Sequence, residues 1–522
     1  MTDRNRIIIV GAGHNGLVCA AYLAKAGREV LVLEAADRVG GAAITREFAP
    51  GFRVSACAHI CYQLDAGISR ELKLDAHGLK TAHANLRTVA LATDGDHLVL
   101  NGGRLEAGLL PDKDRAALGE YHARMLRFAR VLGKQHNRRP PRIGGGGRRD
   151  LIDAAMLGLD IRRLGRTSMR EFLRIAGINI YDVLEESFET PLLKGALALD
   201  AVLGTNLGPR SNNSVLTMLH RLSGQATGVT GGLSLPEGGM GAVSNAIAAA
   251  ARAGGATIRT GSPVARITLE GDRVSGVELE SGEMFTAGTV ISNADPARTL
   301  LQLLGARNLE TGFVHRIRHF RSKGMAAKLH VALDGLPIFS RLAAQRAGDR
   351  LVIAPDAAYI ERAFDRAKHG QCSPDPALEI TIPSIHDRTM APQGRHVLSA
   401  IVQYAPFDPR ASTDTARAEL LERTLALLGR YAPGLRRQVV AAELLLPADI
   451  ECEFRITGGH WHHGELSLDQ FMMLRPVPGA AQYAMPVNGL YLCGAGCHPG
   501  GGVMGSAGRN AARTVLGREP AA

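Results

Sequence analysis

The chain has 522 residues, of which 45% are hydrophobic and 21% are charged, a composition typical of a globular protein with more than one domain and not of a disordered chain. Aromatic residues make up only 4% of it. This is little stacking surface for a single-stranded nucleic-acid binder, so we expect no nucleic-acid partner. The formal net charge of +11 favours anionic cofactors, acidic partners or an anionic membrane surface.

Cysteine spacing and hydropathy exclude further classes of protein. The seven cysteines include no C-x-x-C pair, which excludes a disulfide framework and a dithiol reductase.

No apolar run approaches the roughly 18 residues of a membrane span. The first run, Ile7–Val10, leads directly into a glycine motif, which predicts a strand and not a signal peptide. We expect a cytoplasmic protein with at most peripheral membrane contact, through Arg142 and Arg148 of a basic stretch whose alternative is a solvated loop.

Residues 1–75 have the order of a dinucleotide-binding unit. The run Ile7–Val10 is followed by Gly11-x-Gly13-x-x-Gly16, a helical stretch, and a second strand that ends in Glu34. In such a unit Gly11 permits the tight turn, Gly13 lets backbone approach a pyrophosphate, and Gly16 lets the helix pack close to the sheet. The helix N-terminus favours the phosphates, and Glu34 accepts hydrogen bonds from ribose hydroxyls, which disfavours NADP.

A second glycine pair distinguishes between the two dinucleotides. Gly40-Gly41 follows Glu34 at short distance, where a flavin protein needs its backbone close to an extended ribityl-diphosphate. We therefore predict FAD, with an ordinary Gly-Gly turn as the alternative.

Residues 236–300 and 456–522 add two more dinucleotide-type segments. The first has a glycine loop, an alanine-rich helix and short strands separated by turns, typical of a β-meander on a Rossmann sheet. Val264 is the candidate for clamping the adenine, with a core valine as the alternative. The second has a strand near 490–493, a glycine-rich loop, and a helix that begins near Gly505. The N-terminus of that helix favours an anion or the polarised edge of a flavin.

The segments between them, 76–235 and 301–455, are less patterned. The first carries apolar residues at helical spacing, as in 150–177. This pattern predicts core-facing helices, with a greasy substrate tunnel or a membrane-dipping face as the alternative.

Three stretches together resemble the carotenoid/retinoid oxidoreductase family, which includes the bacterial-type phytoene desaturases. They are the opening GAGHNGLVCAAYLAKAGREVLVLE with VGGAA, the central GGMGAVSNAIAAAARAGG, and the closing GLYLCGAGCHPGGGVMGSAGRNAA. The stretch 467–478, SLDQFMMLRPVP, supports a placement among its phytoene-dehydrogenase-like members.

The resemblance implies an α/β fold of the amine-oxidase type. A Rossmann-type FAD-binding domain is assembled from residues 1–75, 236–300 and 456–522, and an interleaved α+β substrate domain from residues 76–235 and 301–455. The family implies non-covalent FAD and dehydrogenation of an apolar, isoprenoid- or carotenoid-like substrate by hydride transfer to flavin. The implied cofactor contacts are Gly11, Gly13, Gly16, Glu34, Gly40, Gly41, Val264, Gly494, Gly496 and Val503.

The sequence departs from the family pattern at one place and leaves several alternatives open. Many amine oxidases carry an acid after the closing strand, and the sequence here is Cys493-Gly494-Ala495-Gly496, which argues against a true amine oxidase. An FAD-dependent isomerase without net redox change, and an FAD-binding regulatory protein with little turnover, are the alternatives. The substrate, the electron acceptor (O2, a quinone or NAD) and the oligomeric state stay open.

No catalytic residue is assigned by these motifs. The candidates are His460, His462 and His463, one of which we expect to face the flavin as an acid–base group or as a positive partner, with ordinary loop histidines as the alternative. Their spacing has no helical or finger register, so no metal is expected. A covalent flavin at Cys497 is the alternative to non-covalent binding.

Overall fold

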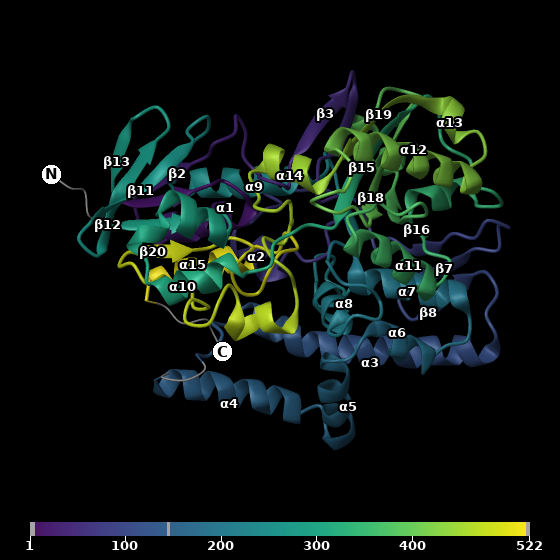
Figure 1. Cartoon of the computed structure of the whole chain (residues 1–522), viewed down its shortest axis with the longest axis horizontal. Coiled ribbons are helices and arrows are strands. Elements are labelled where there is room, and N and C mark those ends of the chain that lie inside the picture. The colour runs from purple at the N-terminus through teal and green to yellow at the C-terminus, as the bar shows by residue number, and fades with distance from the viewer. Residues whose placement is uncertain (1–5, 143–146, 518–522) are drawn as a thin grey trace.

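The computed structural model describes residues 6–142 and 147–517. Figure 1 shows two sheets side by side with their covering helices, and a further layer of helices along one edge of the molecule.

The first sheet has five strands, which come from all three dinucleotide segments. Its order is β10-β2-β1-β14-β20, and all its pairings are parallel. The strands are β1 (Ile7–Val10), β2 (Val30–Leu33), β10 (Thr257–Arg259), β14 (Thr289–Ser292) and β20 (Leu490–Leu492). The predicted fold class, a Rossmann-type sheet assembled from separated segments, is confirmed.

Three helices pack together against this sheet. They are α1 (His14–Lys25), α9 (Met240–Ala253) and α15 (Ser506–Val515). Helix α15 lies so close to α1 that a Cβ on Gly508 would be 2.1 Å from the carbonyl oxygen of Asn15. The predicted β-meander is present as β11 (Val264–Glu270), β12 (Arg273–Leu279) and β13 (Met284–Thr286).

The second sheet has eight strands in the order β19-β15-β18-β17-β16-β6-β7-β8. It is mixed, because β16 and β6 are parallel and the other pairs are antiparallel. The strands are β6 (Thr88–Ala90), β7 (Leu98–Asn101), β8 (Arg104–Ala107), β15 (Ala326–Leu333), β16 (Arg350–Ile353), β17 (Ala377–Thr381), β18 (His396–Gln403) and β19 (Val439–Leu445).

The two faces of the second sheet differ in polarity because side chains alternate along each strand. One face is apolar, with Leu329, Val331 and Ile380 packed in a core that includes residues of α12 (Thr413–Tyr431). The register of the strands places Lys328, Glu379 and the residues paired with them on the opposite face. That opposite face turns toward the first domain and forms part of the site described below.

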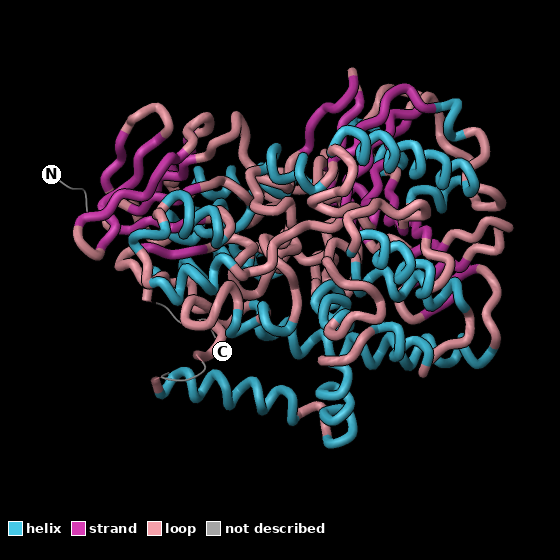
Figure 2. Tube along the Cα trace, viewed as in Figure 1, coloured by secondary structure: helices cyan, strands magenta, loops and turns pink. Residues whose placement is uncertain are grey.

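Helices cover the lower edge in Figure 1. Helices α7 (Pro191–Val202), α8 (Ser214–Leu222) and α11 (Ala357–Lys368) share an apolar core with α3 (Asp112–His136). Two further helices, α4 (Arg148–Arg162) and α5 (Arg166–Ala176), lie on the far side of α3 from both sheets (Figures 1 and 2). Among the described residues, no helix is both long enough and apolar enough to cross a membrane.

Two stretches pack on the domain other than the one to which the sequence assigned them. The ribbon of β3 (Thr45–Ala49) and β4 (Phe52–Ser55) buries Phe52 against Ala332 and Val397 of the second sheet. Helix α10 (Thr311–Arg318) buries Phe313 in the core of the first sheet. The chain therefore passes between the domains at places that local patterns do not mark.

Candidate functional site

A cavity of about 580 Å³ lies between the two domains. It begins at the carboxyl ends of β1, β2 and β14, where Val10, Leu33 and Asn293 line it. At its other end are Glu379 and Ile401 of the second sheet. Ligands of open parallel sheets bind at the carboxyl ends of strands, so the cavity occupies the expected place for a dinucleotide and extends beyond it.

The opening glycines lie at or behind the cavity wall, and not all of them reach the cavity. Gly11 and Gly13 line it, and Gly11 has φ +93, which favours glycine. A Cβ on Gly13 would lie 2.6 Å from Asn293 Nδ2. Gly16 does not line the cavity; a Cβ there would lie 2.3 Å from the carbonyl oxygen of Gly11. Its role is the close packing of α1 on the sheet.

Glu34 is held at the cavity wall by backbone amides. Its Oε2 accepts a hydrogen bond from the Ala12 amide at 2.6 Å, and its Oε1 accepts one from the Ala36 amide at 2.9 Å. A carboxylate offers about four acceptor positions, so acceptor capacity remains for ribose hydroxyls. Glu34 thus lies on the cavity wall, and its contact with ribose hydroxyls stays a prediction.

The second glycine pair joins two loops at the same wall. The Gly40 amide donates to the carbonyl oxygen of Ala12 at 2.9 Å, and a Cβ on Gly40 would lie 2.8 Å from the carbonyl oxygen of Ala43. A Cβ on Gly41 would be 3.4 Å from Gly13 Cα. Both glycines line the cavity, so this pair is more than an isolated turn.

Of the remaining predicted cofactor contacts, the two valines line the cavity and the two closing glycines do not. Val264 and Val503 line the cavity, and Val503 has φ +58, a strained conformation for a β-branched residue that is typical of functional loops. Gly494 and Gly496 do not line it. A Cβ on either would lie 2.4 Å from a neighbour, the Asn293 carbonyl oxygen or Pro296 Cδ. These two glycines allow the closing loop to pack against the loop after β14.

Unpaired polar groups support an anionic ligand at the N-terminus of α1. Asn15 is 1% exposed. Neither the Nδ2 nor the Oδ1 atom of its side chain has a hydrogen-bond partner among the described residues. The helix has no side-chain cap, its N-cap being Gly13. Free N–H groups and the helix dipole favour phosphate groups. The glycine cradle, Glu34 and this helix end together fit the diphosphate and ribose of FAD.

Asn293 and Ala294 are cavity residues that sequence reasoning missed. They follow β14, and the Asn293 amide donates to the carbonyl oxygen of Val10 at 2.8 Å. Their position directly after a predicted strand was the available signal, because carboxyl ends of parallel strands meet at one edge.

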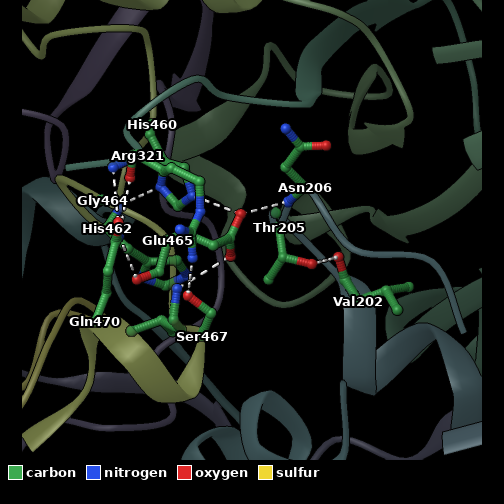
Figure 3. A network of polar contacts seen from close by, with 12 residues as sticks. Val202, Thr205, Asn206, Arg321, His460, His462, Gly464, Glu465, Ser467 and Gln470 are labelled. Carbon is green, nitrogen blue, oxygen red and sulfur yellow. Dashed lines mark hydrogen bonds and ion pairs between the residues drawn. The ribbon is translucent and has the colours of Figure 1, made fainter. Parts of the chain in front are cut away.

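The three candidate histidines do not share one environment. His462 and His463 line the cavity, whereas His460 does not. Figure 3 shows Glu465 between His460 and Asn206. Glu465 Oε2 accepts from the Asn206 amide at 2.7 Å and lies 3.6 Å from His460 Nε2. His460 is therefore a buried neighbour of Glu465, outside the cavity.

Burial keeps the two cavity histidines uncharged. It lowers the pKa of His463 to about 4 and holds the pKa of His462 well below its ordinary value. Neither is thus a positive partner at neutral pH, which disfavours one of the two roles predicted for them. Among the described residues no group of three or more metal-ligating side chains is present.

Arg475 organises the loop that carries the three histidines. The sequence did not single it out. Its guanidinium is fully buried and donates to the carbonyl oxygens of His462 at 2.6 Å, Glu465 at 2.9 Å and Ala495 at 2.9 Å. Burial lowers its pKa to about 10, which still leaves it charged. Arg475 thereby ties the histidine loop to the closing glycine loop.

At the other end of the cavity lies a buried ionic cluster. Glu379 Oε2 accepts from Arg221 Nη2 at 2.6 Å and from Arg350 Nε at 2.5 Å, and Oε1 lies 3.1 Å from His59 Nε2. Burial alone would raise the pKa of Glu379, but the two arginines hold it well below its ordinary value. Arg221, His59 and Glu379 line the cavity.

Lys328 lies on the same sheet face as this cluster. It is fully buried, and its Nζ has no hydrogen-bond partner among the described residues. Burial lowers its pKa to about 7. The signal in the sequence was a charged residue inside the run AAKLHVAL, but only the pairing of strands shows which groups it meets.

Cys497 is buried and is absent from the residues that line the cavity. Burial raises the pKa of its thiol to about 12, so it is not a reactive thiolate.

Comparison with known proteins identifies the class. A family model described as flavin containing amine oxidoreductase matches residues 16–516, and the chain belongs to this family. It is therefore a member of a flavin-containing oxidoreductase family, which implies FAD. The fold resembles that of an oxidoreductase from Methanosarcina mazei, with a TM-score of 0.63, 18% identity, and coverage of 98% of this chain and 100% of that one.

Two relatives with similar sequences show which members of the family this chain resembles. Pyridine nucleotide-disulfide oxidoreductase domain-containing protein 2 of Mus musculus is 35% identical over 544 aligned positions, which cover 98% of this chain and 93% of that protein. A lycopene-forming phytoene desaturase of Pseudescherichia vulneris is 27% identical, with 96% of each chain covered. The resemblance predicted from the motifs is confirmed, including the narrower placement suggested by residues 467–478.

Proposed function

We propose that this protein is an FAD-dependent dehydrogenase that binds its cofactor non-covalently and oxidises an apolar substrate. The observation that carries the proposal is the single cavity that joins the dinucleotide cradle to the face of the substrate-domain sheet. Such a cavity has room for a cofactor and a small molecule side by side between the two domains.

The chain's own residues supply binding and shielding. The opening glycines and Glu34 hold the nucleotide portion, as their geometry allows. The walls beyond it include the apolar side chains of Leu203, Ile401 and Trp461, which favour an apolar substrate. The charged groups beside them, Arg221 and Glu379, are paired with each other. Bound in this cradle, FAD would supply hydride-acceptor chemistry to a substrate held by these walls.

The lack of a charged histidine supports a flavin-driven reaction with little acid–base help. His462 and His463 stay neutral at the cavity wall, and a base with a pKa of about 4 is poorly matched to neutral pH. Isoprenoid- or carotenoid-like compounds are the substrate class we propose, in line with the phytoene desaturase likeness. Loss of a hydride would leave an allylic cation, whose neighbouring proton is acidic enough for even a weak base such as neutral His462 or His463 to take it.

The single tryptophan of the chain offers a direct test of cofactor binding. Trp461 is the one tryptophan in the sequence and lines the cavity. Titration of apoprotein with FAD should quench its fluorescence in parallel with the appearance of a two-banded flavin spectrum. Trp461→Phe is the matched control, which should keep the flavin absorbance and lose the fluorescence signal. Protein that stays colourless and unquenched at high FAD would contradict the proposal.

The reaction is tested by anaerobic incubation of the FAD-loaded protein with isoprenoid hydrocarbons. Bleaching of the flavin with a product that has lost two hydrogens is the expected result. A product with an unchanged hydrogen count would assign an isomerase instead. No bleaching with any of them would leave an FAD-binding protein without this turnover. Flavin that stays with acid-precipitated protein would overturn non-covalent binding.

A further inference from the structure

Helices α4 and α5 form the part of the protein most separated from both sheets (Figures 1 and 2). They follow α3 in the chain and lie beyond it at the edge of the molecule (Figure 1), and none of their residues lines the cavity. Their surface is not part of the site described above.

Helix α4 turns its acidic residues toward the body of the protein. Asp160 is 5% exposed and pairs with Lys134 of α3 and with Arg138, each at 3.0 Å. Asp150 accepts a hydrogen bond from Gln482 Nε2 at 2.7 Å. The remaining acid of the helix, Asp153, lies 3.8 Å from Arg139. The inward contacts of α4 are thus largely ionic.

The same helix turns large apolar side chains toward solvent. Leu151, Ile152 and Leu159 are 71%, 58% and 44% exposed, and Leu173 of α5 is 59% exposed. A surface helix of a globular protein buries its apolar stripe and exposes its charges. The arrangement in α4 is the reverse, and this is expected when the apolar stripe contacts something outside the chain.

Exposed arginines lie at both ends of α4 and along α5. Arg148 is exposed at the start of α4, and Arg162 is exposed at its end. Arg166 and Arg170 are exposed on α5 beside Leu173. An apolar face bordered by cations is typical of a helix that lies in the interface of an anionic membrane.

We propose that the α4–α5 surface, defined by Leu151, Ile152, Leu159, Leu173 and the arginines Arg148, Arg162, Arg166 and Arg170, docks the protein on an anionic lipid bilayer. The helices lie along the membrane surface, with the apolar side chains among the acyl chains and the guanidinium groups at the phosphates. Charge favours lipid over a second copy of this chain, because two such surfaces would bring arginines together. The proposal goes beyond the proposed function and does not depend on it.

Vesicle flotation with the full-length, FAD-loaded protein tests the proposal. Phosphatidylcholine vesicles that contain about one third phosphatidylglycerol should carry the protein upward at low salt, whereas pure phosphatidylcholine vesicles should bind it weakly. Binding to the anionic vesicles should fall as salt rises. Absence of binding to the anionic vesicles at low salt would overturn the proposal.

Variants separate this surface from the rest of the chain. The triple variant Leu151→Ser/Ile152→Ser/Leu159→Ser should lower the vesicle partition coefficient by at least about tenfold. Arg148→Gln and Arg162→Gln should each lower it by about fivefold. The matched control is Leu109→Ser/Ile338→Ser, because these side chains are 85% and 75% exposed elsewhere on the molecule and should not contribute.

Flavin content and the melting temperature of each variant show whether it folds. Partition that is equal in the triple variant and in the control would overturn the proposal. So would a wild-type oligomer that the triple variant turns into a monomer without any change in vesicle binding, because the surface would then be an interface between copies. Binding to acidic protein without binding to anionic vesicles would likewise assign the surface to a protein partner.

Discussion

Lys328 shows how a single side chain is defined by its surroundings. Its ammonium group lies in the interior without a hydrogen-bond partner among the described residues, while Glu379 on the same sheet face is shared by two arginines. A buried charge without a partner is destabilising, whereas a paired one is tolerated. At neutral pH the buried amine of Lys328 therefore lowers the free energy of unfolding, whereas the paired carboxylate of Glu379 raises it.

We expect Lys328→Met to raise the free energy of unfolding by about 1–3 kcal/mol at pH 7, because it removes a buried amine and keeps its volume. The pKa of Lys328 is about 7 when folded and 10.5 is its ordinary value. Between these values the unfolded chain holds more protons, so wild-type stability rises with pH and the gain in the variant shrinks toward pH 10.5. Urea unfolding with saturating FAD at several pH values measures this.

Lys323→Met is the matched control, because Lys323 is an exposed lysine whose side chain pairs with Asp408. Its effect should stay within about 1 kcal/mol. A Lys328→Met protein that is less stable than wild type would mean that the amine has a stabilising partner.

The loop of residues 460–475 is held in its conformation by one buried side chain, Arg475. It has little regular structure, and its conformation depends on one guanidinium that serves several carbonyl oxygens. The closing glycine loop depends similarly on close contacts with residues 293–296, namely the Asn293 carbonyl oxygen and the Pro296 ring. The cavity wall is thus made of loops that hold each other in place.

We expect Arg475→Met to lower the free energy of unfolding by about 3–5 kcal/mol, because buried carbonyl oxygens lose their donor. The affinity for FAD should fall as well, since His462 and Ala495 at the cavity wall lose their anchor. Denaturant unfolding and Trp461 quenching by FAD measure the two effects.

Arg321→Met serves as the control for Arg475. The Arg321 side chain is 55% exposed and pairs with Asp469 in the same loop, so a change below about 1 kcal/mol is expected. Equal effects of the two substitutions would show that Arg475 is not the anchor of this loop.

Several histidines in different parts of the molecule are buried and uncharged at neutral pH. Burial lowers the pKa of His14 to about 3 and those of His59, His220, His463 and His498 to about 4. His14, His59 and His463 line the cavity, whereas His220 lies on α8 and His498 bonds to the carbonyl oxygen of Gln135 on α3. Their protonation states couple the stability of the entire protein to pH.

We expect the melting temperature to fall steeply as pH decreases from about 6.5 to about 4. In this window the unfolded chain takes up protons at these histidines and the folded chain does not, so stability rises with pH. The depressed pKa of Glu379 acts in the same direction, because its contribution is lost as pH falls. Thermal unfolding across this range, with FAD in excess, measures the slope.

His498→Gln provides a check on this assignment. Removal of one buried histidine with a pKa of about 4 should reduce the proton uptake on unfolding by about one near pH 5. A melting temperature that does not change between pH 6.5 and pH 4.5 would contradict the expectation.

Local patterns in the sequence determined the dinucleotide half of the site. The run Ile7–Val10, the spaced glycines and Glu34 specify a strand, a turn and a helix start within a few residues of each other, so their geometry follows from backbone chemistry alone. The same holds for Gly40-Gly41. The three dinucleotide segments were recognisable because each repeats such a local unit.

The substrate half of the site arises from the packing of elements that lie far apart in the chain. Glu379, Arg221 and His59 are separated by between 158 and 320 positions, and no local pattern indicates that they meet. The outward turn of Leu151 and Ile152 is likewise visible only once the ionic contacts of α4 with α3 are known. The physical reason is the same in both cases: chain geometry over a few residues is set by local sterics, whereas the partners of a side chain are set by how distant elements pack.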